Sequence, residues 1–473
     1  MESFNFWDSD VWGFVNIVGV LLLSLLVANM LKKNIPFLKV SLIPTSVLGG
    51  GILLVISLIY TAITGNYIFD TPFFAESGSK YLEIITYHAL ALGFIATTFR
   101  PGREKMTKKR SREVFDTGVT TVSTYLIQGI VGILITALFS LFITGLASYA
   151  GILLPFGYGQ GTGQALNYGN IYESSYGFVG GKDFGLVVAA FGFLSASIGG
   201  VIHLNIINRN NKSRVTGDEE AERLHGRDIQ GEDEIPMNGS MDKLSVQLAF
   251  IFITYVVSYL IMLGLGKLLP GMRAVIYGFN FLFGVLVATA ISAIVKALRK
   301  KGVIKKQYVN SFLMSRVGGF FFDIMVIAGI AVIRLDNIKR YWHVLLVLGI
   351  VGAVLTYFYV RFVCKRLFPD YVEEQFLVMY GMLTGTASSG MILLRERDKD
   401  LVSYAATNIV YQNIPAMVFG FPLMLIANYA PSHPYVTLGI LTGFFILMNL
   451  ILFRSKIFKR KKKDTVDKTD KTE

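Results

Sequence analysis

Two glycine-rich segments of this chain place hydroxyl and amide groups inside regions that are otherwise apolar. The first runs from Gly157 to Ala165 and the second from Gly381 to Gly390, and both contain a Gly-Thr step among small residues. Each segment lies between long apolar runs at a matching place in its half of the chain. Paired, glycine-interrupted segments of this kind indicate the binding site of a membrane transporter.

These segments offer ligands of two kinds. Glycine leaves backbone amides and carbonyls accessible, and threonine and serine add hydroxyls. The amino ends of broken helices favour anions, whereas unwound carbonyls favour sodium. The expected substrate ligands are Gln160, Gly161, Thr162, Gly163, Gln164, Thr386, Ser388, Ser389 and Arg395. The expected ion ligands are Gly159, Gly385, Asp323, Asn408, Gln412 and Asn413.

Each of these assignments has a plainer alternative. Glycines also let helices pack closely in a membrane, but two matched segments favour a site over packing alone. Asp323 follows three phenylalanines in an apolar run, where a carboxylate suggests function, although an ion pair with Arg316 fits nearly as well. Arg395 suits a carboxylate, since a guanidinium binds one bidentately, but it also suits the cytoplasmic rim of the second segment.

Polar side chains within predicted spans need protein or water around them. Asn408, Gln412 and Asn413 precede Pro415, and three amides on a lipid-facing helix would be costly, so they are expected to face protein or water. For His203, a structural hydrogen bond is favoured over a proton relay.

The elements that carry these residues follow from composition. The chain has 473 residues, of which 53% are hydrophobic and only 16% charged, so it holds far more apolar side chain than a soluble core can bury. It is therefore expected to be an all-α polytopic membrane protein. Its single cysteine, Cys364, excludes an internal disulfide and a cysteine-based metal cluster.

Eleven apolar runs are long enough to cross a hydrocarbon core of about 30 Å as helices. The predicted spans are 11–31, 45–63, 81–99, 117–146, 182–207, 245–268, 274–299, 310–334, 341–362, 404–428 and 435–454. The two glycine-rich segments, about 150–170 and 372–394, are too short or too polar to cross, so each is predicted to be a re-entrant hairpin.

The distribution of lysine and arginine predicts the orientation. The short loops after the first, third and seventh spans are basic, as is the tail from Arg454 to Lys463, so these regions belong in the cytoplasm. Eleven crossings then place the amino terminus outside and the carboxyl terminus inside. The net charge of +13 thus reflects topology, and no basic folded domain for nucleic acid is expected.

An odd number of spans in each half gives the halves opposite orientations. Residues 1–207 are predicted to form one five-helix repeat and 244–428 the other, joined by a cytoplasmic linker at 208–243. Residues 429–473 add one extra C-terminal span and a basic tail. The fold class is thus two inverted five-helix repeats, each with a re-entrant hairpin, plus one extra span, which lets two half-sites meet near the membrane midplane.

Several of these segments resemble the sodium/glutamate symporter (ESS) family. The resemblance lies in Gly159 to Gly163 with Tyr176-Gly177, in the stretch from Ile43 to Gly50, and in Gly385 to Ser389, and it extends over nearly the whole chain. It implies two inverted five-helix repeats with re-entrant loops, and glutamate uptake driven by sodium.

A secondary active symporter is accordingly the expected function. It would couple sodium entry to uptake of glutamate or a similar small carboxylate by alternating access, in the cell inner (plasma) membrane. The alternatives are a proton-coupled transporter of another organic anion and, less favoured, a channel, which would show a continuous polar pore. An enzyme is not expected, since no acid-base pair, metal-ligand spacing or Walker loop is present. No cofactor is expected, the coupling ion is sodium, membrane lipid surrounds the chain, and a homodimer remains open.

Overall fold

The computed structural model describes residues 5–99, 107–210, 234, 241–398 and 403–466, and within these ranges the regular elements are helices. The first half contains α1 (Ser9–Asn34), α2 (Pro36–Val40), α3 (Thr45–Thr64), α4 (Gly78–Thr98), α5 (Lys108–Ser140), α6 (Leu153–Gln160), α7 (Thr162–Tyr176) and α8 (Gly181–Asn210). The second half contains α10 (Lys243–Leu268), α11 (Arg273–Gly278), α12 (Asn280–Lys300), α13 (Ser311–Ala331), α14 (Trp342–Leu367), α15 (Val372–Thr384), α16 (Ala387–Arg395), α17 (Ala405–Tyr411) and α18 (Asn413–Tyr429), followed by α19 (Pro434–Val466). Most of the predicted linker, 208–243, lies outside the described residues.

Every predicted span corresponds to a helix or a bent helix pair. Nine helices in the described part of the chain are long and apolar enough to cross a membrane, and the pair α17–α18 makes a tenth. The eleventh predicted crossing is α4, whose 21 residues include Lys80, Glu83 and His88. Twelve residues of α4 are buried, so neighbouring helices rather than lipid surround much of it and relax the need for an apolar surface.

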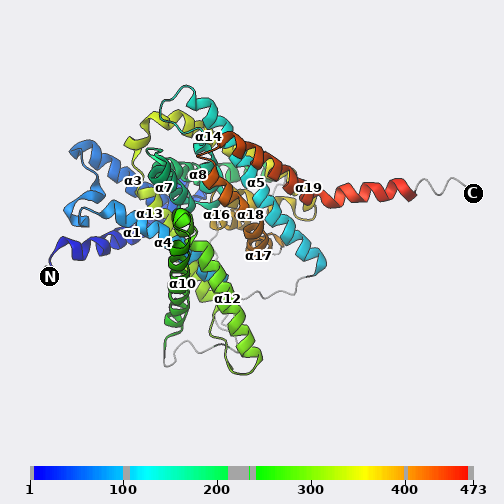
Figure 1. Ribbon diagram of the computed structural model, residues 1–473, viewed down its shortest axis with the longest axis horizontal. Helices are drawn as coiled ribbons and strands as arrows, with labels where there is room; N and C mark the ends of the chain where they lie inside the picture. The colour runs from blue at the N-terminus through cyan, green and yellow to red at the C-terminus, as the bar shows by residue number, and fades with distance from the viewer. Residues whose placement is uncertain (1–4, 100–106, 211–233, 235–240, 399–402, 467–473) are drawn as a thin grey trace, which may run out of the picture.

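The helices form two packed groups (Figure 1). In the first group α4 packs against α13, α3 against α13, and α12 against α4, while α1 and α10 cover α3 and α12. In the second group α5 packs against α14, α18 and α19, and α8 packs against α14 and both arms of α6–α7. The contacts between the halves come in matched pairs. In one pair, α3 of the first half packs against α13 of the second, as α12 of the second half packs against α4 of the first. In the other, α8 of the first half packs against α14 of the second, as α18 of the second half packs against α5 of the first.

The first glycine-rich segment is a helical hairpin, α6–α7, which breaks at Gly161. This residue has φ of +79° and ψ of −170°, a backbone conformation essentially restricted to glycine. Phe156 and Tyr168, on opposite sides of the break, stack with ring centroids 3.9 Å apart, so the chain turns back on itself. A Cβ on Gly157 would lie 2.8 Å from the backbone of Ala189, so the hairpin approaches α8 closely.

The second glycine-rich segment, α15–α16, breaks at Gly385 and Thr386. Thr386 is extended, with φ of −137° and ψ of 168°, whereas Gly385 has φ of −132° and ψ of −105°, outside the helical and extended regions. A Cβ on Gly381 would lie 2.7 Å from the backbone of Gly390, so these two arms also return side by side. The tenth predicted span, 404–428, differs from a continuous helix, because α17 and α18 meet at a bend of 51° around Gln412. Pro415 lies in the first turn of α18, where its missing N–H costs little.

Candidate functional site

The tips of the two hairpins meet inside the protein, although more than 200 residues separate them in sequence. A Cβ on Gly161 would lie 3.7 Å from the Cγ2 of Thr386, 3.9 Å from the Cε of Met325 and 3.9 Å from the ring of Phe193. A Cβ on Gly192 of α8 would clash with the Thr384 carbonyl, so α8 also approaches the second tip. The structure therefore brings the two predicted half-sites together.

The expected substrate ligands of the first hairpin surround its break. Thr162 is fully buried, and its hydroxyl donates to the carbonyl oxygen of Met325 on α13 at 3.3 Å. Gly163 lies against Leu90 of α4, Gln164 is buried, and Gly159 and Gln160 are half-buried. Within the described part of the chain the Nε2 of Gln164 has no hydrogen-bond partner, so this buried amide has an unused donor close to the tip.

The second tip is built around Thr386, which is half-buried. Its hydroxyl oxygen caps α16 by accepting from the backbone N–H of Ser389 at 3.3 Å. Ser389 is itself buried, Gly385 lies beside it, and Ser388 occupies the first turn of α16. This cap leaves the remaining amide groups of the first turn available to an acceptor.

The bend between α17 and α18 brings Gln412 to the second hairpin. Its Nε2 lies 3.5 Å from the Sδ of Met382 and donates to the Oδ1 of Asn413 at 3.1 Å. Gln412 is buried, and its Oε1 has no hydrogen-bond partner among the described residues, whereas Asn413 is exposed. The expectation of protein or water around these amides is met by buried Gln412 and Asn408.

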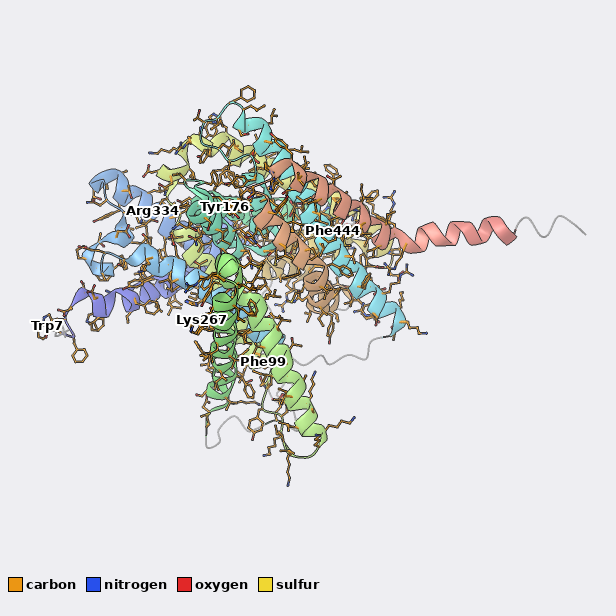
Figure 2. The ribbon with its side chains drawn as sticks, viewed as in Figure 1. Trp7, Phe99, Tyr176, Lys267, Arg334 and Phe444 are labelled. Atoms are coloured by element: carbon orange, nitrogen blue, oxygen red, sulfur yellow. The ribbon has the colours of Figure 1, made fainter. Side chains whose placement is uncertain are left out.

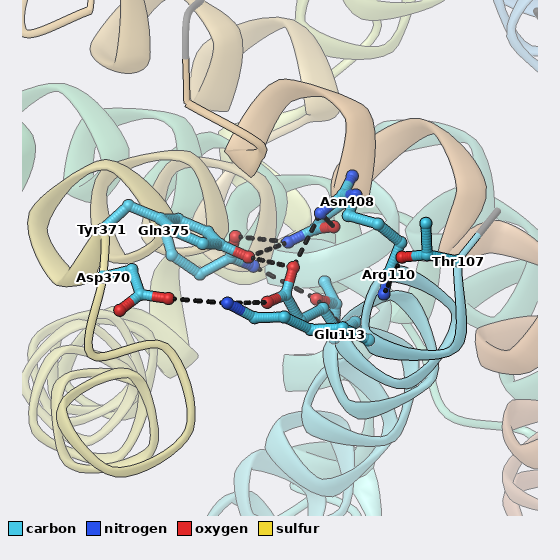
Figure 3. A network of polar contacts seen from close by, with 9 residues as sticks. Thr107, Arg110, Glu113, Asp370, Tyr371, Gln375 and Asn408 are labelled. Atoms are coloured by element: carbon cyan, nitrogen blue, oxygen red, sulfur yellow. Dashed lines mark hydrogen bonds and ion pairs between the residues drawn. The ribbon is translucent and has the colours of Figure 1, made fainter. Parts of the chain in front are cut away.

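Asn408 lies about one helical turn from Gln412 and belongs to a separate polar network at the base of the second hairpin (Figure 3). Its Oδ1 accepts from the Nη1 of Arg110 at 3.0 Å, and its Nδ2 donates to the Oε1 of Gln375 at 3.1 Å. Tyr371 donates to the Oε2 of Glu113 at 2.8 Å, and burial raises the pKa of this tyrosine well above its usual range, so the hydroxyl keeps its proton. The amide is therefore committed to holding α5, α15 and α17 together.

Of the two charged candidates, Asp323 lies on α13, two residues before Met325, and Arg395 lies at the far end of α16. Asp323 hydrogen-bonds to Ser46 of α3, while the Arg316 guanidinium lies over the ring of Phe312 at 5.1 Å. The proposed ion pair between Asp323 and Arg316 is thus absent from the described residues. Arg395 is exposed and ends α16, nine residues or about 13 Å along the helix from Thr386, which matches the rim alternative.

Two open cavities lie where α13 ends and α8 begins. The first has a volume of about 640 Å³ and is lined by residues including Tyr67, Asp70 and Arg334. The second has a volume of about 470 Å³, shares Asp70 and Arg334 with the first, and is also lined by Glu83 and Lys182. Arg334 lies near α3 (Figure 2), pairs with Asp70 and donates to the Ser79 hydroxyl at 2.9 Å. Neither cavity is lined by a residue of the hairpin tips.

Sequence reasoning missed the part of α5 that contacts both hairpins. The hydroxyl of Tyr125 donates to the carbonyl of Gly159 at 3.0 Å, and the Nε2 of Gln128 donates to the carbonyl of Leu383 at 3.1 Å. The signal was present in the sequence, since the predicted span 117–146 begins with a run of threonines and contains Gln128. Polar side chains deep in a membrane span are costly in lipid, so they indicate a functional site, just as a glycine-rich hairpin does.

Comparison with known proteins identifies the family of this chain. The family model for the sodium/glutamate symporter matches residues 14–377, which include the whole first hairpin and end before the tip of the second. A comparison with curated protein sequences finds no significant match. The family transports glutamate and sodium and is not a family of enzymes. With more than three quarters of its length matched, this multi-pass membrane protein belongs to the sodium/glutamate symporter family.

Proposed function

We propose that this chain is a secondary active symporter that couples sodium entry to the uptake of glutamate or a similar small carboxylate. The observation that carries the proposal is the meeting of the two hairpin tips at Gly161 and Thr386. Four helix ends converge there, and each carries a partial charge of about half an electron. One small volume therefore offers ligands for both an anion and a cation.

The two kinds of helix end divide the work of binding. The amino ends of α7 and α16, at Thr162 and Ala387, present amide groups to a carboxylate, together with the hydroxyl of Thr386, because the Thr162 hydroxyl already donates to Met325. The carboxyl ends of α6 and α15, at Gln160 and Thr384, present carbonyl groups to a cation. Gly159 and Gly385 contribute backbone oxygens on this side.

Alternating access follows if the halves are inverted repeats. The reciprocal packing of α3 on α13 and of α12 on α4 supports a pseudo-two-fold relation between 1–207 and 244–428. The first hairpin then opens to the outside and the second to the inside, with the amino terminus outside and the carboxyl terminus in the cytoplasm. The membrane is the inner (plasma) membrane, no cofactor is required, and a homodimer is compatible with this arrangement.

Coupling to sodium makes the cycle sensitive to voltage. Glutamate carries one net negative charge, so transport with more than one sodium ion moves positive charge inward. Each net charge gains about 2.3 kcal/mol per 100 mV of negative interior potential. Asp323 remains a candidate for a further ion site on α13, and a proton-coupled transporter of another organic anion is the alternative.

The test is uptake of labelled glutamate into proteoliposomes of the purified protein. We expect uptake to require an inward sodium gradient and to accelerate when the interior is made negative with potassium and valinomycin. Thr386→Val should reduce uptake strongly, because it removes the hydroxyl at the tip with little change in volume. Thr442→Val on α19 is the matched control, since this hydroxyl bonds only to its own helix in the described structure and is exposed.

The outcomes separate the parts of the proposal. Unchanged uptake with a proton gradient in sodium-free buffer would reject sodium coupling. Uptake of a different carboxylate, without any flux of glutamate, would retain the mechanism and replace the substrate. Parental uptake by Thr386→Val would remove the second tip from the site.

A further inference from the structure

The middle of α5 contacts both hairpins through side chains on one face. Tyr125 and Gln128 are three residues apart, so they lie next to each other on the helix surface. Tyr125 donates to Gly159, two residues before the first break, and Gln128 donates to Leu383, two residues before the second. Both acceptors are carbonyls in the last turn of a helix, where the helix dipole is negative.

Gln128 has an unusual set of partners. It is fully buried, and its Nε2 lies 2.7 Å from the Oγ1 of Thr356 on α14 and 3.1 Å from the carbonyl oxygen of Leu383. The other end of the same carboxamide, Oε1, is buried and has no hydrogen-bond partner among the residues that the structure describes. Leaving a buried acceptor unpaired is unfavourable, and here it leaves one strong oxygen ligand unused.

Thr356 is oriented to act as an acceptor. Its hydroxyl donates to the carbonyl of Gly352 at 2.7 Å within α14, so its lone pairs face Gln128. The residue is fully buried, like Gln128. Two oxygen atoms, from Thr356 and Leu383, therefore point at one end of a carboxamide that can present either nitrogen or oxygen after a rotation of 180°.

We propose that Gln128, Thr356 and the carbonyl of Leu383 form a sodium site at the second hairpin, in which Gln128 changes from hydrogen-bond donor to ion ligand. Without the ion, Nε2 faces the two oxygens, as observed. With the ion, Oε1 turns inward, so that the oxygens of Gln128, Thr356 and Leu383 surround the cation. These three partly negative oxygens would repel one another without it, and the positive ion between them removes that repulsion. Hard cations prefer such oxygen ligands, and unwound or terminal helix carbonyls bind sodium in transporters.

This inference rests on the proposed sodium coupling and gives it a physical route. Leu383 lies three residues before Thr386, so an ion held between α5, α14 and Leu383 fixes the position of the tip that contacts the carboxylate. Binding of sodium then strengthens binding of the substrate, and the linkage is reciprocal. The expected signature is a change in sodium affinity that is larger than the change in intrinsic glutamate affinity.

Sodium binding is measured first without transport, by thermal unfolding of the detergent-purified protein at constant ionic strength, with choline replacing sodium. In the parental protein the unfolding midpoint should rise with sodium, because a ligand that binds only the folded state stabilises it. In Thr356→Val and Gln128→Leu the half-saturating sodium concentration should rise by about tenfold or more, as expected when a metal site loses a ligand. Gln128→Glu keeps an oxygen ligand and adds a negative charge, so it should bind sodium at least as tightly as the parent.

Thr254→Val is the matched control. Thr254 is also fully buried and also donates to the carbonyl four residues earlier, but it lies on α10, apart from both hairpins. Its variant should lose stability by a similar amount while keeping the parental response to sodium. If Gln128→Leu fails to fold, Thr356→Val and Gln128→Glu decide the outcome.

Uptake in proteoliposomes then separates this site from the general proposal. The half-saturating sodium should rise in Thr356→Val, while the half-saturating glutamate, measured at saturating sodium, should change less than about threefold. Sodium-dependent parental uptake together with parental sodium affinity in Thr356→Val and Gln128→Leu would overturn the site and leave the function standing. Absence of any sodium dependence in the parent would overturn both.

Discussion

The two hairpins share a Gly-Thr break but differ in how the break is made. The first turns at Gly161, whose positive φ demands glycine, and its arms have 8 and 15 residues. The second turns over Gly385, whose φ is negative, and Thr386, which is extended, and its arms have 13 and 9 residues. In sequence order the long arm follows the break in the first hairpin and precedes it in the second. The likeness seen in the sequence is therefore a likeness of the tips and not of the whole segments.

The hairpins also differ in what holds their bases. The long arm of the first is held mainly by tyrosines, since Tyr168 and Tyr172 donate to carbonyls of α18 at 3.0 and 2.7 Å, and Glu173 near its end accepts from the backbone N–H of Lys182 at 3.1 Å. The long arm of the second is held by charges, since Glu373 pairs with Arg361 and lies 2.9 Å from the Nε2 of His203. His203 also contacts the hydroxyl of Tyr357 at 2.7 Å, so the expected structural hydrogen bond is confirmed. The base of the second hairpin thus relies on an ion pair, whereas the tyrosine anchors of the first are neutral.

The strongest test of the comparison is to determine from which side of the membrane an impermeant reagent reaches the base of each hairpin, the end away from its tip. In a Cys364→Ala background, Ser175→Cys marks the end of the first hairpin and Asp370→Cys marks the start of the second, and both positions are exposed. An impermeant maleimide added to intact cells should label Ser175→Cys fully and leave Asp370→Cys unlabelled until the membrane is permeabilised.

The control for labelling is the Cys364→Ala protein, which should remain unlabelled in both conditions. Cys364 is buried and is the one cysteine of the chain, so the background contributes no signal. Labelling of both positions from the same face would contradict the inverted arrangement of the halves.

The difference between the two breaks predicts different responses to alanine. In Gly161→Ala the new Cβ meets no atom closer than 3.7 Å, so its cost comes from the backbone conformation, about 1–3 kcal/mol. In Gly385→Ala there is no positive-φ strain, since φ is −132°, but the Cβ would lie 2.9 Å from the Oγ of Ser389 and 3.1 Å from the carbonyl oxygen of Gly381. We expect Gly161→Ala to lower the thermal unfolding midpoint and uptake together, whereas Gly385→Ala should mainly reduce uptake.

A further pair of variants distinguishes these causes. Gly161→Asn should be tolerated no better than Gly161→Ala, because asparagine adopts positive φ in the left-handed region, at ψ of about +30 to +60°, whereas Gly161 has ψ of −170°. Ser389→Ala should partly restore uptake to Gly385→Ala by removing the hydroxyl that the new methyl group meets. Equal behaviour of the two alanine variants in both measurements would remove the distinction between the tips.

Much of this architecture could be predicted from the sequence, because lipid imposes a simple rule on lipid-facing helices. Apolar runs of about 20 residues predicted the helices, and glycine clusters predicted both hairpins within a few residues. The bend at Gln412 was not predicted, since Pro415 alone does not distinguish a kink from the first turn of a new helix.

The candidate site was harder to predict because it depends on contacts between distant segments. The tips could be identified from their own composition, but the roles of Asn408 and Arg395 depend on where α15, α16 and α17 place them. Asn408 proved to bridge Arg110 and Gln375, which no local pattern reveals. Gln128 and Thr356 looked like isolated polar residues in apolar helices, and only the fold shows that they face each other and Leu383.

The smallest expected effect concerns the anchors of the two bases. Tyr172→Phe removes one hydrogen bond to the carbonyl of Ala427 and should cost about 0.5–1.5 kcal/mol. Glu373→Gln removes the charge that pairs with Arg361. Because the Glu373 side chain is 26% exposed, we expect a loss of stability of about 1–2 kcal/mol, between the values for surface and buried ion pairs. The two costs overlap in size but differ in origin.

Thermal unfolding of detergent-purified protein, with choline chloride varied between low and high concentration, separates these two costs. The stability difference between parent and Glu373→Gln should shrink at high salt, since ions screen a partly exposed pair, while the difference for Tyr172→Phe should stay constant. If both differences respond to salt equally, the two bases are held by the same kind of interaction.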